Sequence, residues 1–234
     1  MEVTVVMQDT PGLEVRKKIA FIQEALLKWY ELRGRKHLPW RGEGLSAFHK
    51  LVAEIMLQKT RAENIVKVYT EFVKRYPDPA SLATEDENRL ASFLKPLGLY
   101  RNRARNLIRL AKIISSTKEI PCDRSFLEKL PGVGPYIANA FLLSVCNKRV
   151  PLVDTNVRRL LIRVFSLRVK RDPRRDPEVW DFVEKLLPER NHREFAWALL
   201  DLAALTCRSK KPECQECPIN IVCDYYNSGR KVDL

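Results

Sequence analysis

Four of the six cysteines of this chain lie close together, between residues 207 and 223. Their spacing is C-x6-C-x2-C-x5-C, with the four residues being Cys207, Cys214, Cys217 and Cys223. Four thiolates this close repel one another unless a metal centre or disulfide bonds take them up, and an all-cysteine set suits zinc or an iron–sulfur cluster. Zinc sites usually take their ligands from two CxxC motifs, and this segment has one, at Cys214 and Cys217. The spacing therefore favours an iron–sulfur cluster, and a zinc site stays open as the alternative. Disulfides are disfavoured because nothing resembles a signal peptide and a chain of this length needs no staples.

Composition indicates an anionic partner. The chain has 42 Lys and Arg against 29 Asp and Glu, a formal net charge of +13 and a pI near 9.6. Such a surface suits polyanions, although many basic proteins only carry solvated cationic faces. No apolar run approaches the roughly 20 residues that a membrane span needs. We therefore expect a soluble, cytoplasmic protein.

The hydrophobic pattern has the period of α-helices along most of the chain. Prolines and short connections separate the helical segments and leave little room for a sheet. The predicted helices are 15–33, 49–75, 86–94, 102–116, 124–129, 135–146, 155–166, 176–187 and 193–206. The pattern predicts a compact all-α fold with a small metal-bound segment at its end.

Residues 127–141, LEKLPGVGPYIANAF, have the pattern of a helix–hairpin–helix. Pro131 stops the first helix and Pro135 starts the second, while Gly132 and Gly134 permit positive φ and close approach of a neighbour. The exposed backbone N–H groups of such a hairpin can bind a phosphate. A tight interhelical turn that binds nothing is the simpler interpretation of PGVG alone.

Asp154 stands directly before a strongly apolar helix, in VPLVDTNVRRLLIRVF at residues 150–165. By itself this position predicts an N-cap whose carboxylate accepts hydrogen bonds from the backbone at Asn156 or Val157.

Together these motifs resemble the helix–hairpin–helix DNA glycosylases of the endonuclease III and MutY superfamily. Members of that superfamily carry LPGVG, a catalytic Asp in VD-x-N-V-x-R, and a [4Fe–4S] cluster with this cysteine spacing. The resemblance runs from KWYELRGRKHLPWRG at residues 28–42 to the last cysteine. It implies a two-lobed fold, with 45–148 as a six-helix barrel domain and 1–44 plus 149–234 as a helical iron–sulfur cluster domain. It also implies a monomer whose partner is double-stranded DNA with a mismatched or damaged base, and no membrane.

Individual residues discriminate within the superfamily. Tyr136 replaces the lysine whose amine gives endonuclease III-like enzymes their lyase activity, and a phenol forms no imine. Trp197, in FAWALLD, replaces the glutamine that contacts adenine in MutY-like enzymes. The chain stops eleven residues after Cys223, which leaves no room for the second MutY domain. These features resemble the archaeal MIG-type glycosylases, which remove thymine or uracil opposite guanine, and imply an archaeal source.

Two other functions stay open. One is an adenine glycosylase acting opposite guanine or oxidised guanine, since Glu54 and the LPWR motif are shared with MutY. The other is a non-catalytic DNA-binding module, which would need no carboxylates such as Asp154 and Glu54 near a polyanion.

The resemblance assigns roles to particular residues. Asp154 stabilises the positive charge that develops on the sugar, Glu54 positions water or donates to the departing base, and Tyr136 stacks on the flipped base. Without the resemblance, Glu54 would be interpreted as a solvated surface residue and Tyr136 as an aromatic residue of the core.

Further residues are assigned to the base and to DNA. Trp197 belongs to the base pocket, while Gln58 in LQKT and Leu99 in LGLY are candidate wedges that fill the gap left in the duplex. The alternative for these two is an exposed loop and a helix end. The candidates for phosphate contact are Gly132, Val133, Gly134, Lys59, Arg101, Arg158 and Lys210. Cys122 and Cys146 are expected to be ordinary thiols.

Overall fold

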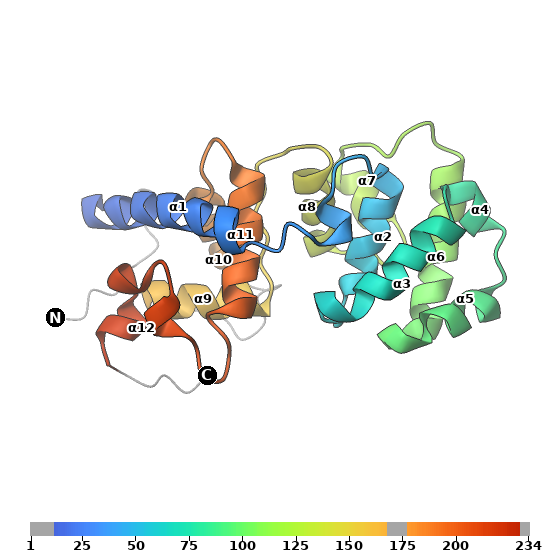
Figure 1. Ribbon diagram of the computed structural model, residues 1–234. Coiled ribbons are helices and arrows are strands. Elements are labelled where there is room, and N and C mark those ends of the chain that lie inside the picture. The colour runs from blue at the N-terminus through green and yellow to red at the C-terminus, as the bar shows by residue number, and fades with distance from the viewer. Residues whose placement is uncertain (1–11, 168–176, 230–234) are drawn as a thin grey trace. The chain divides into compact units, whose positions relative to one another are not determined.

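The computed structural model describes residues 12–167 and 177–229, and within these ranges it contains helices and no β-strand (Figure 1). The predicted all-α fold is confirmed. The chain divides into two compact units. One unit is Lys36–Lys148, and the other consists of the residues up to Arg35 together with those from Arg149 onward. No helix in the described ranges is long and apolar enough to cross a lipid bilayer.

The unit Lys36–Lys148 is built around α6, which packs against α4 and α5, and around α2, which packs against α3 and α8. Helix α3 shows why these segments are helical: Ile65, Tyr69 and Phe72 are fully buried and follow one another at helical spacing. The elements are η1 (Pro39–Arg41), α2 (Ala47–Leu57), α3 (Ala62–Arg75), α4 (Pro79–Ala83), α5 (Glu87–Leu94), η2 (Lys95–Leu97), α6 (Tyr100–Ser115), α7 (Arg124–Lys129) and α8 (Pro135–Ser144).

The predicted single helix over 49–75 is wrong, because the chain breaks between α2 and α3. Lys59 has φ of 55°, in the left-handed region, and Thr60 donates from Oγ1 to the carbonyl of Leu97 at 2.9 Å. Both helices bury their apolar faces in the same core, so the hydrophobic period continues across the break and conceals it. The short helix α4 and the 3₁₀ turns were also not predicted.

In the second unit, α1 packs against α11, and α9 packs against both α11 and α12 (Figure 1). Lys18 of α1 donates to the carbonyl of Val164 and to Asp224 Oδ1, both at 2.6 Å, so the start and the end of the described chain are joined. Fully buried Asp201 accepts from the backbone N and the Nε of Arg35, both at 2.8 Å. The helices are α1 (Leu13–Arg33), α9 (Thr155–Phe165), α10 (Pro177–Leu186), α11 (His192–Leu205) and α12 (Asp224–Asn227), with η4 (Cys214–Glu216) and η5 (Asn220–Val222).

Cys122 and Cys146 form a disulfide, so the expectation that they are ordinary thiols is wrong. Their Cα atoms are 5.9 Å apart, although 24 residues separate them in sequence. Packing of α7 against α8 brings together the segment before the first helix and the segment after the second. This proximity depends on how the two helices pack, which the pattern of each helix alone does not show.

Candidate active site

The hairpin between α7 and α8 has one strained glycine and one unstrained one. Gly132 has φ of 82°, and a Cβ there would lie 3.1 Å from Nδ2 of Asn106. Gly134, the N-cap of α8, has extended backbone with φ of −103°, so the expected positive φ is wrong for this residue. A Cβ at Gly134 would meet nothing within 4 Å. The chain's own packing therefore gives no reason for glycine at this position.

Three segments far apart in sequence are linked at this end of the unit. Gln58, the C-cap of α2, is exposed and donates from Nε2 to the carbonyl of Gly132 at 2.9 Å. Leu99, which precedes α6, is 53% exposed and has φ of 49°. The bond from Thr60 to Leu97 joins the segments that carry these two residues. The two predicted wedge residues thus lie on connected loops, with Gln58 bonded to the hairpin.

The predicted basic candidates of this unit are close in sequence to the two wedge residues, with Lys59 directly after Gln58 and Arg101 in the first turn of α6. Lys59 and Arg101 are both exposed. The guanidinium of Arg101 lies 5.9 Å from the centre of the Tyr100 ring. Val133, between the two hairpin glycines, is buried, so it can offer a ligand only its backbone.

Glu54 lies on α2 and is half-buried. Burial raises its pKa to about 7, and the attraction of Arg41 lowers it by less. The alternative of a freely solvated glutamate is therefore wrong. Tyr136 is half-buried in the first turn of α8, the helix that packs against α2. Two of the predicted catalytic residues are thus on packed helices of one unit.

Asp154 is the N-cap of α9, as its position in the sequence predicts. Its Oδ1 accepts from the backbone N of Asn156 at 2.9 Å and of Val157 at 2.7 Å, and its Oδ2 accepts from Nδ2 of Asn156 at 2.8 Å. Three donors therefore fix the orientation of this carboxylate.

A chain of hydrogen bonds runs from Asp154 toward the segment 207–223, which carries the four cysteines and is called the cysteine loop below. Arg159 donates to Oδ1 of Asn156 at 3.1 Å, to the carbonyl of Ala203 at 2.7 Å and to the carbonyl of Cys207 at 3.0 Å. Desolvation lowers the pKa of Arg159. Asn156 was not predicted as a site residue, although both it and Arg159 belong to the VD-x-N-V-x-R motif.

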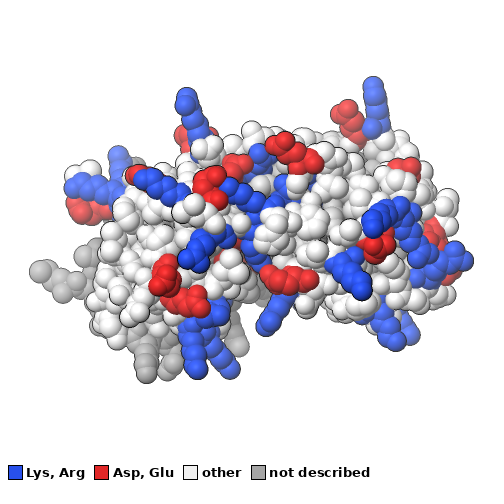
Figure 2. Space-filling view, in the orientation of Figure 1, with Lys and Arg blue, Asp and Glu red and all other residues white. Residues whose placement is uncertain are grey.

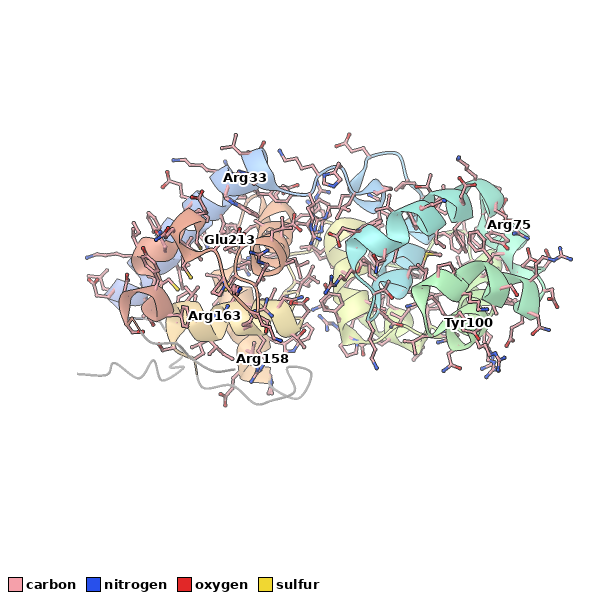
Figure 3. The ribbon with its side chains drawn as sticks, turned by 60° about the horizontal axis from the view of Figure 1, so that its bottom comes forward. Arg33, Arg75, Tyr100, Arg158, Arg163 and Glu213 are labelled. Carbon is pink, nitrogen blue, oxygen red and sulfur yellow. A yellow bond between two sulfur atoms is a disulfide. The ribbon has the colours of Figure 1, made fainter. Side chains whose placement is uncertain are left out.

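The remaining predicted residues of this unit are on α9, α11 and the cysteine loop. Trp197 is half-buried on α11, with the guanidinium of Arg193 5.5 Å from its ring centre. Arg158 is half-buried on α9, and Lys210 is exposed. Figure 3 shows Arg158 and Arg163 extending from α9, with Glu213 within the cysteine loop, directly before Cys214.

Cys207, Cys214, Cys217 and Cys223 are free thiols and line one cavity, which contains about 320 Å³ of space partly open to solvent. Burial raises the pKa of three of them, that of Cys217 to about 12. Nη1 of Arg163 lies 3.4 Å from Sγ of Cys207, and Arg163 also donates to the carbonyls of Arg208 and Ser209.

Across residues 12–167 and 177–229, no three His, Cys, Asp or Glu side chains stand in an arrangement that could hold a metal ion as they are. The donor set nevertheless fits a thiophilic centre, since four cysteines line one cavity and none of them forms a disulfide.

The helical fold, the glycine-containing hairpin and the capped Asp154 define a helix–hairpin–helix DNA repair protein. Residues 52–185 match the HhH-GPD superfamily of base excision DNA repair proteins, and the chain belongs to this family. The resemblance found in the sequence is thereby confirmed.

Two relatives and one solved structure are similar over nearly the whole chain. The chain is 40% identical over 216 residues to the thymine-DNA glycosylase of Aeropyrum pernix, covering 90% of this chain and 96% of that protein. It is 39% identical over 216 residues to the thymine/uracil-DNA glycosylase of Pyrobaculum aerophilum, covering 90% and 94%. The solved structure of a thermostable thymine-DNA glycosylase aligns with a TM-score of 0.84 at 27% identity, over 92% of this chain and 99% of that one.

Proposed function

We propose that this protein is a DNA glycosylase that removes thymine or uracil mispaired with guanine from double-stranded DNA. The observation that carries the proposal is a fixed carboxylate, Asp154, following the hairpin in a chain 40% identical to a thymine-DNA glycosylase. Tyr136 and Trp197 support the choice of base, because neither side chain suits the lyase or the adenine-reading role. An aromatic pocket accepts the thymine methyl group, and a few polar groups hold the edge of the base.

Cleavage of the N-glycosidic bond leaves positive charge on the sugar, and we assign its stabilisation to Asp154. The three hydrogen bonds to this carboxylate keep it in one orientation, so little reorganisation accompanies the reaction. Glu54 is assigned to the departing base, because its raised pKa leaves a substantial protonated fraction at neutral pH. Water completes the hydrolysis, and Tyr136 and Trp197 contact the flipped base.

Binding to DNA is assigned to the predicted wedge and phosphate residues. Gln58 and Leu99 fill the gap that the flipped base leaves, and their exposure supports this role. The backbone of the hairpin at Gly132, Val133 and Gly134 contacts phosphates. The side chains assigned to phosphates are Lys59, Arg101, Arg158 and Lys210. We expect the enzyme to act as a monomer.

The cysteine loop is proposed to hold a [4Fe–4S] cluster through Cys207, Cys214, Cys217 and Cys223. When bound, such a cluster would supply iron–sulfur links that fix the loop, with no part in cleaving the glycosidic bond. The loop carries Arg208, Lys210 and Lys211, so its fixation would hold basic side chains in place for the DNA backbone.

A panel of duplexes tests the function. With G·T, G·U, A opposite oxidised guanine and A·G, the protein should leave alkali-labile sites fastest at T or U opposite G. Borohydride should trap almost no covalent complex, since Tyr136 provides no amine. Asp154→Asn, which keeps the shape and removes the charge, should retain mismatch binding and lose most turnover.

Each alternative function predicts a different result on this panel. Faster release of adenine would assign the protein to a short adenine glycosylase. Binding without any abasic product would assign it to a non-catalytic DNA-binding module. Robust borohydride trapping would contradict the absence of lyase activity.

A further inference from the structure

Arg103 is a buried cation on α6 whose guanidinium is fully used in hydrogen bonds. Arg103 as a whole is only 3% exposed to solvent. All five N–H groups of the guanidinium have acceptors. Nε donates to the carbonyl of Ile55 at 3.3 Å, and Nη1 donates to the carbonyls of Leu97 and Gly98. Nη2 donates to the carbonyl of Gln58 at 2.9 Å and to Oγ1 of Thr60 at 3.4 Å. In the described part of the chain, no carboxylate lies within ion-pair distance of Arg103.

The acceptors belong to two loops that are distant in sequence. Ile55, Gln58 and Thr60 are in or next to the break between α2 and α3, whereas Leu97 and Gly98 precede α6. The planar fork of the guanidinium therefore binds both loops at once, and Thr60 adds a direct bond between them. Oγ1 of Thr60 itself lies within hydrogen-bond distance of the carbonyls of Gln58 and Leu97, so this side chain also contacts both loops.

These two loops contain backbone conformations that L-residues rarely adopt. Lys59 has φ of 55° on one loop, and Leu99 has φ of 49° on the other. Leu99 in addition leaves a large apolar side chain 53% exposed. Left-handed backbone and an exposed leucine both oppose folding, and such features persist only where surrounding contacts over-determine them. The contacts to Arg103 fulfil that condition.

We propose that Arg103 is a positioning residue that locks the two wedge loops into one rigid body, so that Gln58 and Leu99 enter the duplex together. The inference rests on the proposed function, because the wedge roles of Gln58 and Leu99 belong to it. Arg103 itself is buried and touches no DNA. It acts by fixing the carbonyl of Gln58 itself and the carbonyls of Leu97 and Gly98 directly before Leu99, which sets the direction of the inserting side chains.

Replacement of Arg103 by Lys tests the proposal. Lysine keeps the charge but presents three donors from a single atom, so it cannot bind both loops as the fork does. The rate of thymine release from a G·T duplex in a single turnover, at saturating enzyme, should fall about 10- to 100-fold. Affinity for a matched duplex should change little, because phosphate contacts do not require insertion.

A double-mutant cycle distinguishes positioning from general weakening of the fold. If Arg103 acts through the wedge, Arg103→Lys should have almost no further effect on the rate once Leu99→Ala has removed the inserting side chain. Fold-losses that multiply in the double variant would overturn the inference. Arg105→Lys is the matched control, because Arg105 is exposed two residues further on the same helix, and its rate should equal that of the wild type.

A second variant keeps the test decisive if Arg103→Lys fails to fold. Thr60→Val removes the hydroxyl that links the loops and leaves every charge in place. It should slow thymine release by a smaller factor and should likewise be silent in the Leu99→Ala background. Full activity of Thr60→Val, or a loss that multiplies with that of Leu99→Ala, would reject the locking role. Absence of base release by the wild type would instead reject the proposed function.

Discussion

At the scale of single residues, the raised pKa of Glu54 predicts a pH dependence for release of the base. Its pKa is raised from 4.5 to about 7 by burial. If the protonated form assists departure of the base, the single-turnover rate should fall as pH rises through about 7. The Glu54→Gln variant should have a lower single-turnover rate, and this rate should no longer fall as pH rises through about 7. If the rate of Glu54→Gln still falls as pH rises through this range, another group is responsible for the pH dependence.

The same shift makes a prediction for stability. Because the folded state binds the proton of Glu54 more tightly than the unfolded state, the free energy of unfolding should fall as pH rises from about 4.5 to about 7. Glu54→Gln lacks this contribution, so the difference between variant and wild type in urea denaturation should change across this window. A difference that is constant with pH would contradict the raised pKa.

The residues of the candidate site could be predicted from the sequence where they belong to a recognisable motif. Asp154 is an N-cap both by sequence and by structure, and the four cysteines line one cavity as their spacing suggests. Arg103 and Arg163 were not predicted, because their partners are mostly backbone carbonyls of distant segments. A backbone carbonyl leaves no signature in a sequence, so contacts of this kind become visible only in the fold.

At the scale of the elements, the two hairpin glycines should respond differently to alanine. Gly134 has extended backbone and open space around its missing Cβ, so Gly134→Ala should keep or raise stability by roughly 0.4–1 kcal/mol. Affinity for duplex DNA should nevertheless fall, because the methyl group occupies the space that a phosphate needs. Thermal denaturation and DNA titration measure the two effects.

Gly132→Ala is the matched control for the hairpin. With φ of 82° and Asn106 3.1 Å from the new Cβ, this change should destabilise the fold by about 1–2 kcal/mol. Unchanged DNA affinity of Gly134→Ala would place the phosphate elsewhere.

The disulfide between Cys122 and Cys146 encloses α7, the hairpin and α8. Because it restricts the unfolded chain, its removal in Cys122→Ser/Cys146→Ser should lower the free energy of unfolding by about 3 kcal/mol. Reduction of the wild type should have the same effect, measured by urea denaturation with and without a thiol. The double variant should not respond to the reductant, and equal stability of all samples would contradict the prediction.

Helix positions were predictable where a stop signal accompanies the hydrophobic period. The segment 124–129 agrees with α7, which lies between Asp123 and Pro131. The break near Lys59 carries no proline or glycine, and hydrogen bonds join its neighbours Gln58 and Thr60 to Arg103 of α6 and to Leu97 of another loop. Tertiary contacts of this kind override local preference, so the break was missed.

At the scale of the whole molecule, charge alone does not locate the DNA surface. On the face drawn in Figure 2, basic side chains are spread widely, with acidic side chains among them. The net charge of +13 should nevertheless make duplex binding weaken as salt rises.

The proposed cluster would link metal content to the stability of the unit that carries the cysteine loop. Protein purified without air should be brown and contain iron, and Cys214→Ser should lose iron and lower the melting temperature. The control is Cys122→Ser/Cys146→Ser, which replaces the two disulfide-bonded cysteines of the other unit and should keep its iron. Metal analysis and visible absorption check both variants, and a colourless protein with one zinc would reject the cluster.

The bond between Lys18 and Asp224, and the packing of α1 on α11, affect the order in which the chain can fold during synthesis. All residues of the unit Lys36–Lys148 are made, and leave the ribosome, ahead of those of α9 and α11, so this unit can complete its core early. Helix α1 is made before this unit, yet its contacts with α11 can form only once α11 has been made. Helix α1 is therefore among the last of the described helices to complete its packing, and its apolar face is the surface that a chaperone would meet on the nascent chain.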